Sequence, residues 1–223
     1  MGGEGASAVA HIHSYLEELR TTRPSVALAV DRSAKGRETL LSVLAAARVL
    51  FVRDGHAGLS MRKVASEAGL SVGNLSYYFP SKSVLIEATL REALADYVEA
   101  HIDHVGDGRA APLETLLNVV SFYVTNARTS HPFFYSMWGF AASAPEAREL
   151  VRELYAPIGR FVYALVRAAR PDASDARVRE IVLHIFSLEE GLKLFIGMGP
   201  DDDPALRSAE RHVRELAHRI VLS

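Results

Sequence analysis

The sequence contains no cysteine, and its nine prolines and fifteen glycines are too few for a disordered or fibrous chain of 223 residues. Without cysteine, the chain can form no disulfide, no thiolate nucleophile and no Cys-ligated zinc site. The longest apolar run, from Leu40 to Val52, is interrupted by Arg48 and is too short to span a bilayer. The first ten residues carry Glu4 and no basic segment ahead of an apolar core, unlike a secretory signal. We therefore expect a cytoplasmic globular protein with no membrane partner.

Charge is distributed unevenly along the chain, although the formal net charge is only −2. Residues 34–82 hold seven basic and three acidic side chains, whereas residues 83–223 hold fifteen basic and twenty acidic ones. A small basic block joined to a larger acidic one favours a module that binds a polyanion, attached to a part that does not. Chance clustering on a solvated face is the alternative, so the charge pattern needs a motif to support it.

Apolar residues recur with a period near 3.6 in almost every segment, and no segment shows the sustained alternation of a half-buried strand. This pattern predicts an all-α protein. Residues 1–33 are the least regular and are expected to form a flexible N-terminal arm. We expect helices at about Ala34–Arg53, Met61–Ala68, Val72–Tyr78, Ser81–Val105, Leu113–Arg128, Pro132–Ala142, Pro145–Arg170, Ser174–Gly197 and Pro204–Leu222.

Two of these expected helices are short and are joined by a turn of three residues, Gly69-Leu70-Ser71. Glycine permits the sharp turn, and Ser60 and Ser71 stand where the N-caps of the two helices belong. Pro80 prevents the second helix from continuing. Residues 60–79 are therefore predicted to form a helix-turn-helix, whose second helix begins with small residues that fit into a major groove.

Residues 37–97 closely resemble the DNA-binding domain of the TetR family of bacterial transcriptional regulators. The matching segments are Ala46–Phe51, Asp54-Gly55, Leu59–Ala65, Ala68–Leu75 and Tyr77–Lys82. The resemblance implies an N-terminal helix-turn-helix domain at residues 37–97, followed at 98–223 by a larger helical domain that binds a ligand and dimerises. It also implies a repressor that binds double-stranded DNA at a palindromic operator, although activation stays open.

Carried over by position, the resemblance implies that Ser60, Tyr77 and Lys82 contact phosphates, with Arg62 near the backbone or a base edge. Hydroxyl groups, cations and a helix N-terminus are the groups that bind phosphates in proteins. Two alternatives stay open at this point, namely that Lys82 is merely solvated and that Tyr77 is a core aromatic residue.

Base reading would fall to the first residues of the second short helix. Ser71 and Gly73 keep this end slim, Val72 could pack against a thymine methyl group, and Asn74 could bind an adenine edge. Tyr78 is a further candidate, and the alternative for Asn74 is a local cap. At Asn74 and Tyr78 the chain departs from the residues usual in the family, so the resemblance does not fix the base preference.

A second predicted site lies in the central helices, where Pro157 is expected to kink its helix beside many aromatic residues. Family members commonly bind a small inducer there, which implies an apolar or amphipathic effector for this chain. The candidate contacts are Phe122, Phe134, Tyr135, Trp138 and Phe161. Aromatic stripes are more often plain core, and that alternative stays open for each of them.

The last two long helices carry apolar residues at alternating spacings of three and four, which is typical of a helix–helix seam. The predicted interface residues are Ile181, Ile185, Leu188, Leu192, Phe195, Val213, Leu216 and Ile220. Two such helices from each of two chains would form a four-helix interface in a homodimer. A seam within one chain is the alternative.

Other functional classes find less support. Gly69–Gly73 matches the G-x-S-x-G pattern of a hydrolase nucleophile, but that pattern needs a strand before it, and a helix is expected here. No phosphate-binding loop, dinucleotide motif or zinc-protease motif is present, so we expect no enzyme activity, no cofactor and no metal. An enzyme with an unrecognised site and a protein-binding adaptor are the remaining alternatives.

Overall fold

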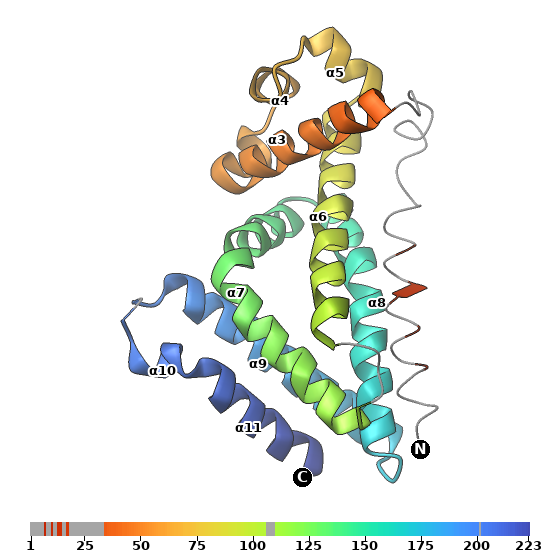
Figure 1. The fold of residues 1–223 in the computed structure, drawn as a ribbon, viewed down its shortest axis with the longest axis vertical. Coiled ribbons are helices and arrows are strands. Elements are labelled where there is room, and N and C mark those ends of the chain that lie inside the picture. The colour runs from red at the N-terminus through yellow and green to blue at the C-terminus, as the bar shows by residue number, and fades with distance from the viewer. Residues whose placement is uncertain are drawn as a thin grey trace. The chain divides into compact units, whose positions relative to one another are not determined.

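The computed structural model of the protein describes residues 34–105, 110–200 and 202–223, together with a few separate positions before residue 34. Every regular element in these ranges is a helix, which confirms the all-α prediction (Figure 1). The arm predicted at residues 1–33 lies outside the described residues, apart from those separate positions. Among the described helices, none is both long enough and apolar enough to cross a membrane.

The helices divide into two compact units. They are α3 (Ala34–Gly58), α4 (Met61–Glu67), α5 (Val72–Tyr78), α6 (Lys82–Val105), α7 (Pro112–Ser143), α8 (Pro145–Ala169), α9 (Asp175–Met198), α10 (Pro204–Arg207) and α11 (Ala209–Leu222). Residues 34–97 and Phe133–Leu154 belong to the first, which we call the helix-turn-helix unit. Val98–Pro132 and Tyr155–Ser223 belong to the second, the C-terminal unit. Helices α6, α7 and α8 each contribute to both units.

Helix α3 forms because its apolar residues recur on one face, and that face lies in the core of the helix-turn-helix unit. Leu40, Leu44, Ala47 and Phe51 are all less than 10% exposed. The regular helix stops at Gly55, whose φ of 66° requires a left-handed conformation that glycine adopts without steric cost. One further turn then leads to Gly58.

The segment Phe133–Leu154 packs within this same unit, although it lies far along the chain. The ring of Phe140 makes an edge contact with Phe51 at 6.1 Å, and Ser136 Oγ donates to the carbonyl of Val52 at 3.4 Å. Arg91 on α6 pairs with Glu153 on α8 at 3.2 Å. The compact units therefore interleave along the chain, whereas the assignment of separate functions to residues 37–97 and 98–223 stays a prediction.

The C-terminal unit is held together by apolar packing and by arginine side chains that reach across helices. Helix α9 packs against α11, and the two lie side by side in Figure 1. Arg214 on α11 pairs with Glu114 and donates to Asn118 Oδ1 at 2.9 Å, both on α7. Arg128 donates to the carbonyl of Leu206 at 2.7 Å and so attaches α10 to α7.

Two helix boundaries differ from the expected ones. The pattern predicted a break between Arg128 and Pro132, but α7 runs without interruption through Pro132. Proline removes one backbone hydrogen bond, and Ser130 Oγ and His131 Nδ1 make hydrogen bonds with the carbonyls of Asn126 and Ala127 in the turn before it. The predicted helix from Pro204 to Leu222 is instead divided at Ser208 into α10 and α11.

Candidate functional site

Helices α4 and α5 form the predicted helix-turn-helix, and each begins at a serine cap. Ser60 Oγ accepts from the backbone N–H of Lys63 at 3.3 Å, and Ser71 Oγ accepts from that of Asn74 at 3.1 Å. Gly69 has a φ of 67°, which produces the sharp turn between the helices. Local sequence signals therefore fix both the ends of these helices and the turn between them.

One face of α5 is fully buried and the other faces water. Leu75 and the residue that ends the helix, Phe79, have no exposed surface, and they anchor α5 in the core of the unit. On the opposite side, Val72 is 43% exposed and Tyr77 is 62% exposed. The N-terminal turn of α5, residues 71–74, is thus exposed.

Four of the predicted base-reading residues lie on this accessible end, whereas Tyr78 is the last residue of α5. Ser71, Val72, Gly73 and Asn74 are exposed, and Tyr78 is half-buried. The backbone amide of Asn74 takes part in the cap, while its side chain remains exposed. Whether these side chains read bases stays a prediction.

The predicted phosphate-binding residues flank α5. Arg62 is exposed on α4, Ser60 is half-buried, and Lys82 is half-buried as the first residue of α6. Tyr77 packs edge-on against Tyr78 at 5.6 Å, and its exposure shows that it is not a core residue. The hydroxyl of Ser60 accepts in the helix cap, yet it keeps its own proton for donation to a phosphate.

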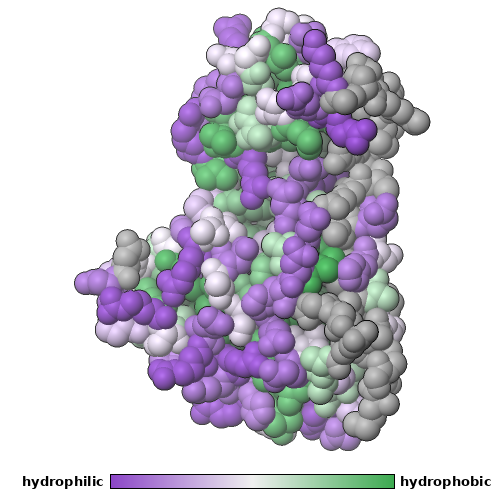
Figure 2. Space-filling model, viewed as in Figure 1, coloured by the Kyte–Doolittle hydropathy of each residue, from purple (hydrophilic) through white to green (hydrophobic). Residues whose placement is uncertain are grey.

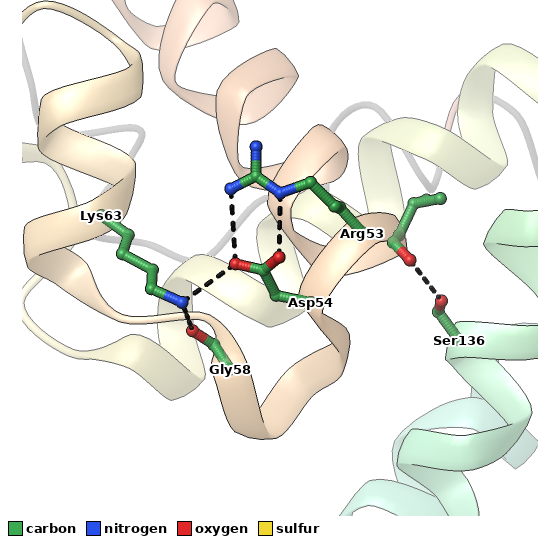
Figure 3. A network of polar contacts seen from close by, with 6 residues as sticks. Arg53, Asp54, Gly58, Lys63 and Ser136 are labelled. Carbon is green, nitrogen blue, oxygen red and sulfur yellow. Dashed lines mark hydrogen bonds and ion pairs between the residues drawn. The ribbon is translucent and has the colours of Figure 1, made fainter.

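A network of charged groups joins the end of α3 to α4 (Figure 3). Asp54 Oδ1 lies 2.8 Å from Arg53 Nε, and Asp54 Oδ2 lies 3.0 Å from Lys63 Nζ, which also donates to the carbonyl of Gly58 at 2.9 Å. Hydrogen bonds from Arg53 and Lys63 lower the pKa of Asp54 to about 2. No local sequence pattern predicted this contact, because Asp54 and Lys63 are nine residues apart.

Arg48, another basic side chain of residues 34–82, also forms an ion pair within the chain. Arg48 on α3 pairs with Asp96 on α6 at 2.9 Å, and its guanidinium lies over the ring of Phe133 at 5.5 Å. The charges of Arg48, Arg53 and Lys63 are therefore largely used to hold the helix-turn-helix unit together. Arg62 on α4 and Lys82 at the start of α6 keep accessible surface, as do Lys35 and Arg37 near the start of α3.

The five predicted effector residues divide between the two units. Phe134, Tyr135 and Trp138 belong to the helix-turn-helix unit, where Phe134 packs edge-on against Tyr97 at 5.1 Å. Phe122 and Phe161 belong to the C-terminal unit and are buried there. The structure thus separates the predicted set into two aromatic groups, and contact with a ligand stays a prediction for all five residues.

The aromatic group of the C-terminal unit includes a buried histidine, His101, which was not among the predicted effector residues. The His101 ring stacks on Phe122 at 4.9 Å and 7°, and also contacts Tyr123 at 5.1 Å and Phe161 at 5.4 Å. Burial, with a smaller contribution from His104, lowers the pKa of His101 to about 3, so its ring is neutral at physiological pH. In the described part of the chain, no three His, Asp or Glu side chains lie together as metal ligands would.

The predicted dimer residues fall into two groups. Ile181 and Ile185 on α9 have no exposed surface, and Val213 on α11 is only 2% exposed. These three side chains form the seam between α9 and α11 of one chain, which corrects the prediction that they contact a second chain. The other five keep accessible surface, since Leu188, Leu192 and Ile220 are half-buried and Phe195 and Leu216 are exposed, and their role stays a prediction.

The residues predicted to face inward on α9 differ from those that are buried because of the pitch of the helix. A straight helix has 3.6 residues per turn, so its inward face drifts by about 20° per heptad from a strict seven-residue repeat. In the second half of α9, the inward positions are those of Glu189 and Lys193, one residue beyond the predicted Leu188 and Leu192. Both charged side chains are less than 5% exposed. A stripe counted from Val178 at one step of three and then three steps of four would have found them.

An apolar face remains accessible on α9 and α11. Phe195 is 64% exposed, and Leu183, Leu194 and Met198 are exposed at spacings that place them on one side of α9. Leu216 on α11 is 37% exposed. We call these five residues the α9/α11 apolar face. In the view of Figure 2, hydrophilic side chains predominate and apolar side chains form small separate patches.

The sequence is similar to those of known bacterial regulators. The sequence pattern of the bacterial regulatory proteins of the tetR family matches residues 43–89. The chain is 31% identical over 170 residues to the HTH-type transcriptional regulator BetI of Paraburkholderia xenovorans (strain LB400), covering 71% of this chain and 83% of that protein.

Solved structures share the fold. A putative transcriptional regulator from Saccharomonospora viridis in complex with choline has a TM-score of 0.66 and 19% identity, covering 83% of this chain and 96% of that one. The transcriptional regulator FadR from Bacillus subtilis in complex with stearoyl-CoA also has a TM-score of 0.66, with 18% identity over 79% of this chain and 96% of that one.

The stabilisation that the ion pairs of Asp54 provide can be tested by varying the pH. Asp54→Asn should destabilise the protein at neutral pH, because the amide cannot pair with Arg53 and Lys63. The folded-state pKa lies near 2, below the ordinary 3.8, so this stabilisation is complete above about pH 4 and declines as the pH falls through 2. Urea denaturation should therefore show a constant gap between wild type and variant above about pH 4, and a smaller one at each step below.

A double-mutant cycle with Lys63→Met provides the control for this prediction. In the Lys63→Met background, Asp54→Asn should cost less than it does in the wild type, because one of the two partners of the carboxylate is already gone. A gap that is equal in both backgrounds, or that does not shrink at low pH, would contradict the assigned network.

Proposed function

Because the chain belongs to the TetR family of bacterial regulatory proteins, we propose that this DNA-binding transcriptional regulator is a ligand-responsive repressor that binds a palindromic operator as a homodimer. The observation that carries the proposal is the exposed N-terminal turn of α5, from Ser71 to Asn74, on a helix whose other face is fully buried. A rigidly anchored helix with a slim accessible end fits the geometry by which such a motif enters the major groove.

In the proposed complex, small and polar groups of α5 approach the base edges. Val72 provides an apolar contact for a thymine methyl group, and Asn74 can form paired hydrogen bonds with an adenine edge. The hydroxyls of Ser60 and Tyr77 and the cations of Arg62 and Lys82 contact the phosphates on either side. The phosphate contacts supply most of the affinity and make it depend strongly on salt.

The α9/α11 apolar face supports the proposed homodimer. Large apolar side chains such as Phe195 and Met198, at 64% and 73% exposure, are costly to leave in water when they lie together on one face. A two-fold axis beside α9 and α11 would bury this face of both chains at once. The same axis would present two copies of α5 to the two halves of a palindrome.

The proposed response to a ligand rests on helices that connect the two units. Helix α6 carries Lys82 at its first residue and His101 near its C-terminal end, so a ligand that displaces the aromatic group around His101 acts on the same helix. The two similar structures with bound choline and stearoyl-CoA support the proposal that this chain also takes a small molecule. Release of DNA requires that the ligand bind the DNA-free conformation more tightly.

We propose that the protein acts by binding and not by catalysis, in the cytoplasm where the bacterial chromosome lies. Repression is the simplest outcome of occupying an operator, and a reporter gene behind the operator distinguishes it from activation. The effector would set only the fraction of operator that is occupied, since binding of DNA and of effector are reciprocally coupled.

Substitutions in the two kinds of DNA contact should have different effects. Lys82→Ala should weaken binding to all sequences alike and reduce the salt slope by about one, because one phosphate contact is lost. Asn74→Ala should change the preference at one position of each half-site, by about 1–3 kcal/mol. Fluorescence anisotropy over a salt series, combined with selection from random DNA, measures both effects. Arg211→Ala, at an exposed position on α11, is the control and should leave both unchanged.

The proposed interface between chains can be tested by introducing a charged side chain into it. Phe195→Glu places a carboxylate on the α9/α11 apolar face, and sedimentation at micromolar concentration should then show one chain where the wild type shows two. Leu41→Glu changes another exposed apolar side chain, on α3 in the helix-turn-helix unit, and should remain dimeric. A wild-type protein that sediments as a single chain, or a Phe195→Glu variant that still pairs, would contradict this interface.

A further inference from the structure

The described chain passes between the two units three times, and each time it does so inside a helix. Helix α6 crosses after Tyr97, α7 after Pro132 and α8 after Leu154. Within the described ranges, no loop joins the helix-turn-helix unit to the C-terminal unit. A change in the angle between the units must therefore bend these three helices.

Helix α8 contains two residues that weaken a helix, and both follow closely after its crossing point. Pro157 has no backbone N–H, so the carbonyl of Glu153 lacks its helical hydrogen bond. Gly159 lies two residues later and loses more backbone entropy than alanine would when it becomes helical. The resistance of α8 to bending is therefore reduced between Glu153 and Phe161, and we call this segment the α8 joint.

Neither packing nor backbone conformation requires a glycine at position 159. Positive φ angles occur at Gly55 and Gly69 but not at Gly159, and a Cβ added to Gly159 would meet no atom within 4 Å. At Gly199, by contrast, an added Cβ would lie 2.7 Å from the carbonyl oxygen of Phe195, so packing excludes a larger residue. Alanine would fit at position 159 and would strengthen the helix, so the effect of the glycine is to weaken α8.

Helix α7 is weakened at its crossing point as well, whereas α6 is not. Pro132 is the last residue of α7 within the C-terminal unit, and it removes the backbone hydrogen bond to the carbonyl of Arg128. Helix α6 contains neither proline nor glycine from Lys82 to Val105, and Ala, Leu and Glu, which favour helix, recur along it. Of the three connecting helices, α6 is therefore the stiff one.

Both ends of the α8 joint are held by contacts within their own units. On one side, Glu153 pairs at 3.2 Å with Arg91 on α6, and Arg91 also pairs with Glu87 at 3.0 Å. On the other side, Phe161 and Val162 have no exposed surface and lie in the core of the C-terminal unit. Bending of α8 is therefore concentrated in the two turns between these anchored ends.

We propose that α7 bends at Pro132 and α8 bends at its joint, so that the helix-turn-helix unit turns with α6 intact and adjusts to the spacing of two half-sites on DNA. This inference rests on the proposed function and adds a conformational device to it. One extra base pair moves two half-sites apart by about 3.4 Å and rotates them by about 35° about the DNA axis. A rigid dimer fits one spacing, whereas a dimer with these joints also accepts neighbouring spacings at small cost.

Hydrogen exchange of the full-length protein tests the α8 joint without DNA. The amides of residues 158–161 bond to the carbonyls of residues 154–157, so their exchange reports opening of the helix at the joint. Gly159→Ala should slow this exchange by about two- to fivefold after correction for intrinsic rates, because alanine favours the helix. Exchange at the wild-type rate would show that the glycine does not weaken α8, and would overturn the proposal.

Binding to DNA with altered half-site spacing tests the consequence. The stiffened variant combines Pro157→Ala with Gly159→Ala, and the DNA is that selected by the wild type from random sequence. Insertion of one base pair between the half-sites should weaken binding of the stiffened variant at least about fivefold more than that of the wild type, because bending an intact helix costs more. Gly159→Ala alone should show a smaller loss in the same direction. An equal loss in all three proteins would overturn the proposal.

Gly139→Ala is the matched control. Gly139 is exposed on α7 within the helix-turn-helix unit, away from each crossing point, and a Cβ added there would also meet no atom within 4 Å. This variant should exchange like the wild type at residues 158–161 and should tolerate the inserted base pair equally well. A change as large as that of Gly159→Ala would show that any added helix propensity has this effect, and would contradict a role for the joint.

The two measurements separate this inference from the proposed function on which it rests. If Gly159→Ala slows exchange as expected but the wild-type protein binds no DNA, the proposed regulator is wrong. If the wild type binds DNA and the stiffened variant tolerates the inserted base pair equally, the proposed regulator stands and the adjustment by α8 is wrong.

Discussion

The burial of one face of α5 is the constraint on which the rest of the helix-turn-helix unit depends. Leu75 and Phe79 have no exposed surface, so they fix the rotation of the helix about its axis and direct its other face toward water. The caps at Ser60 and Ser71 and the turn at Gly69 then determine where each helix starts. A helix of seven residues is too short to be stable in isolation, and it forms here because tertiary packing holds it.

Electrostatics reinforces this arrangement. Pairs within the chain occupy Arg48, Arg53 and Lys63, and they connect α3 to α4 and α6. Four other basic side chains of residues 34–82 keep accessible surface, namely Lys35 and Arg37 on α3, Arg62 on α4 and Lys82 at the start of α6. In the C-terminal unit, by contrast, two charged side chains of α9, Glu189 and Lys193, are buried. Burial of such groups is costly for stability, and Lys193 offsets part of this cost by pairing with Glu190 at 2.9 Å.

Much of the helix-turn-helix unit could be predicted from the sequence, because its signals are local. Serine caps, a glycine that permits a positive φ, and a proline after the helix act within a few residues of themselves. Contacts that depend on tertiary packing could not be predicted in this way. The pairing of Asp54 with Lys63 and the packing of Phe140 against Phe51 join residues that no local pattern connects.

The C-terminal helices show a second limit of sequence patterns. A heptad pattern does not state whether the partner helix belongs to the same chain, and Val213 proved to be part of an internal seam. The pattern also overlooked Glu189, since charged residues are rarely expected inside a core. The accessible positions that remain on α9 define the proposed contact with a second chain.

The central claim is that the N-terminal turn of α5 lies in the major groove when the protein binds DNA. Because the chain contains no cysteine, a label can be attached at one chosen position to measure this directly. A single cysteine introduced by Asn74→Cys can carry chelated iron, which cleaves DNA close to its point of attachment. On DNA selected by the protein from random sequence, the account predicts two cleavage centres related by two-fold symmetry. Cleavage no stronger than that from the same chelate attached through Glu210→Cys on α11 would contradict it.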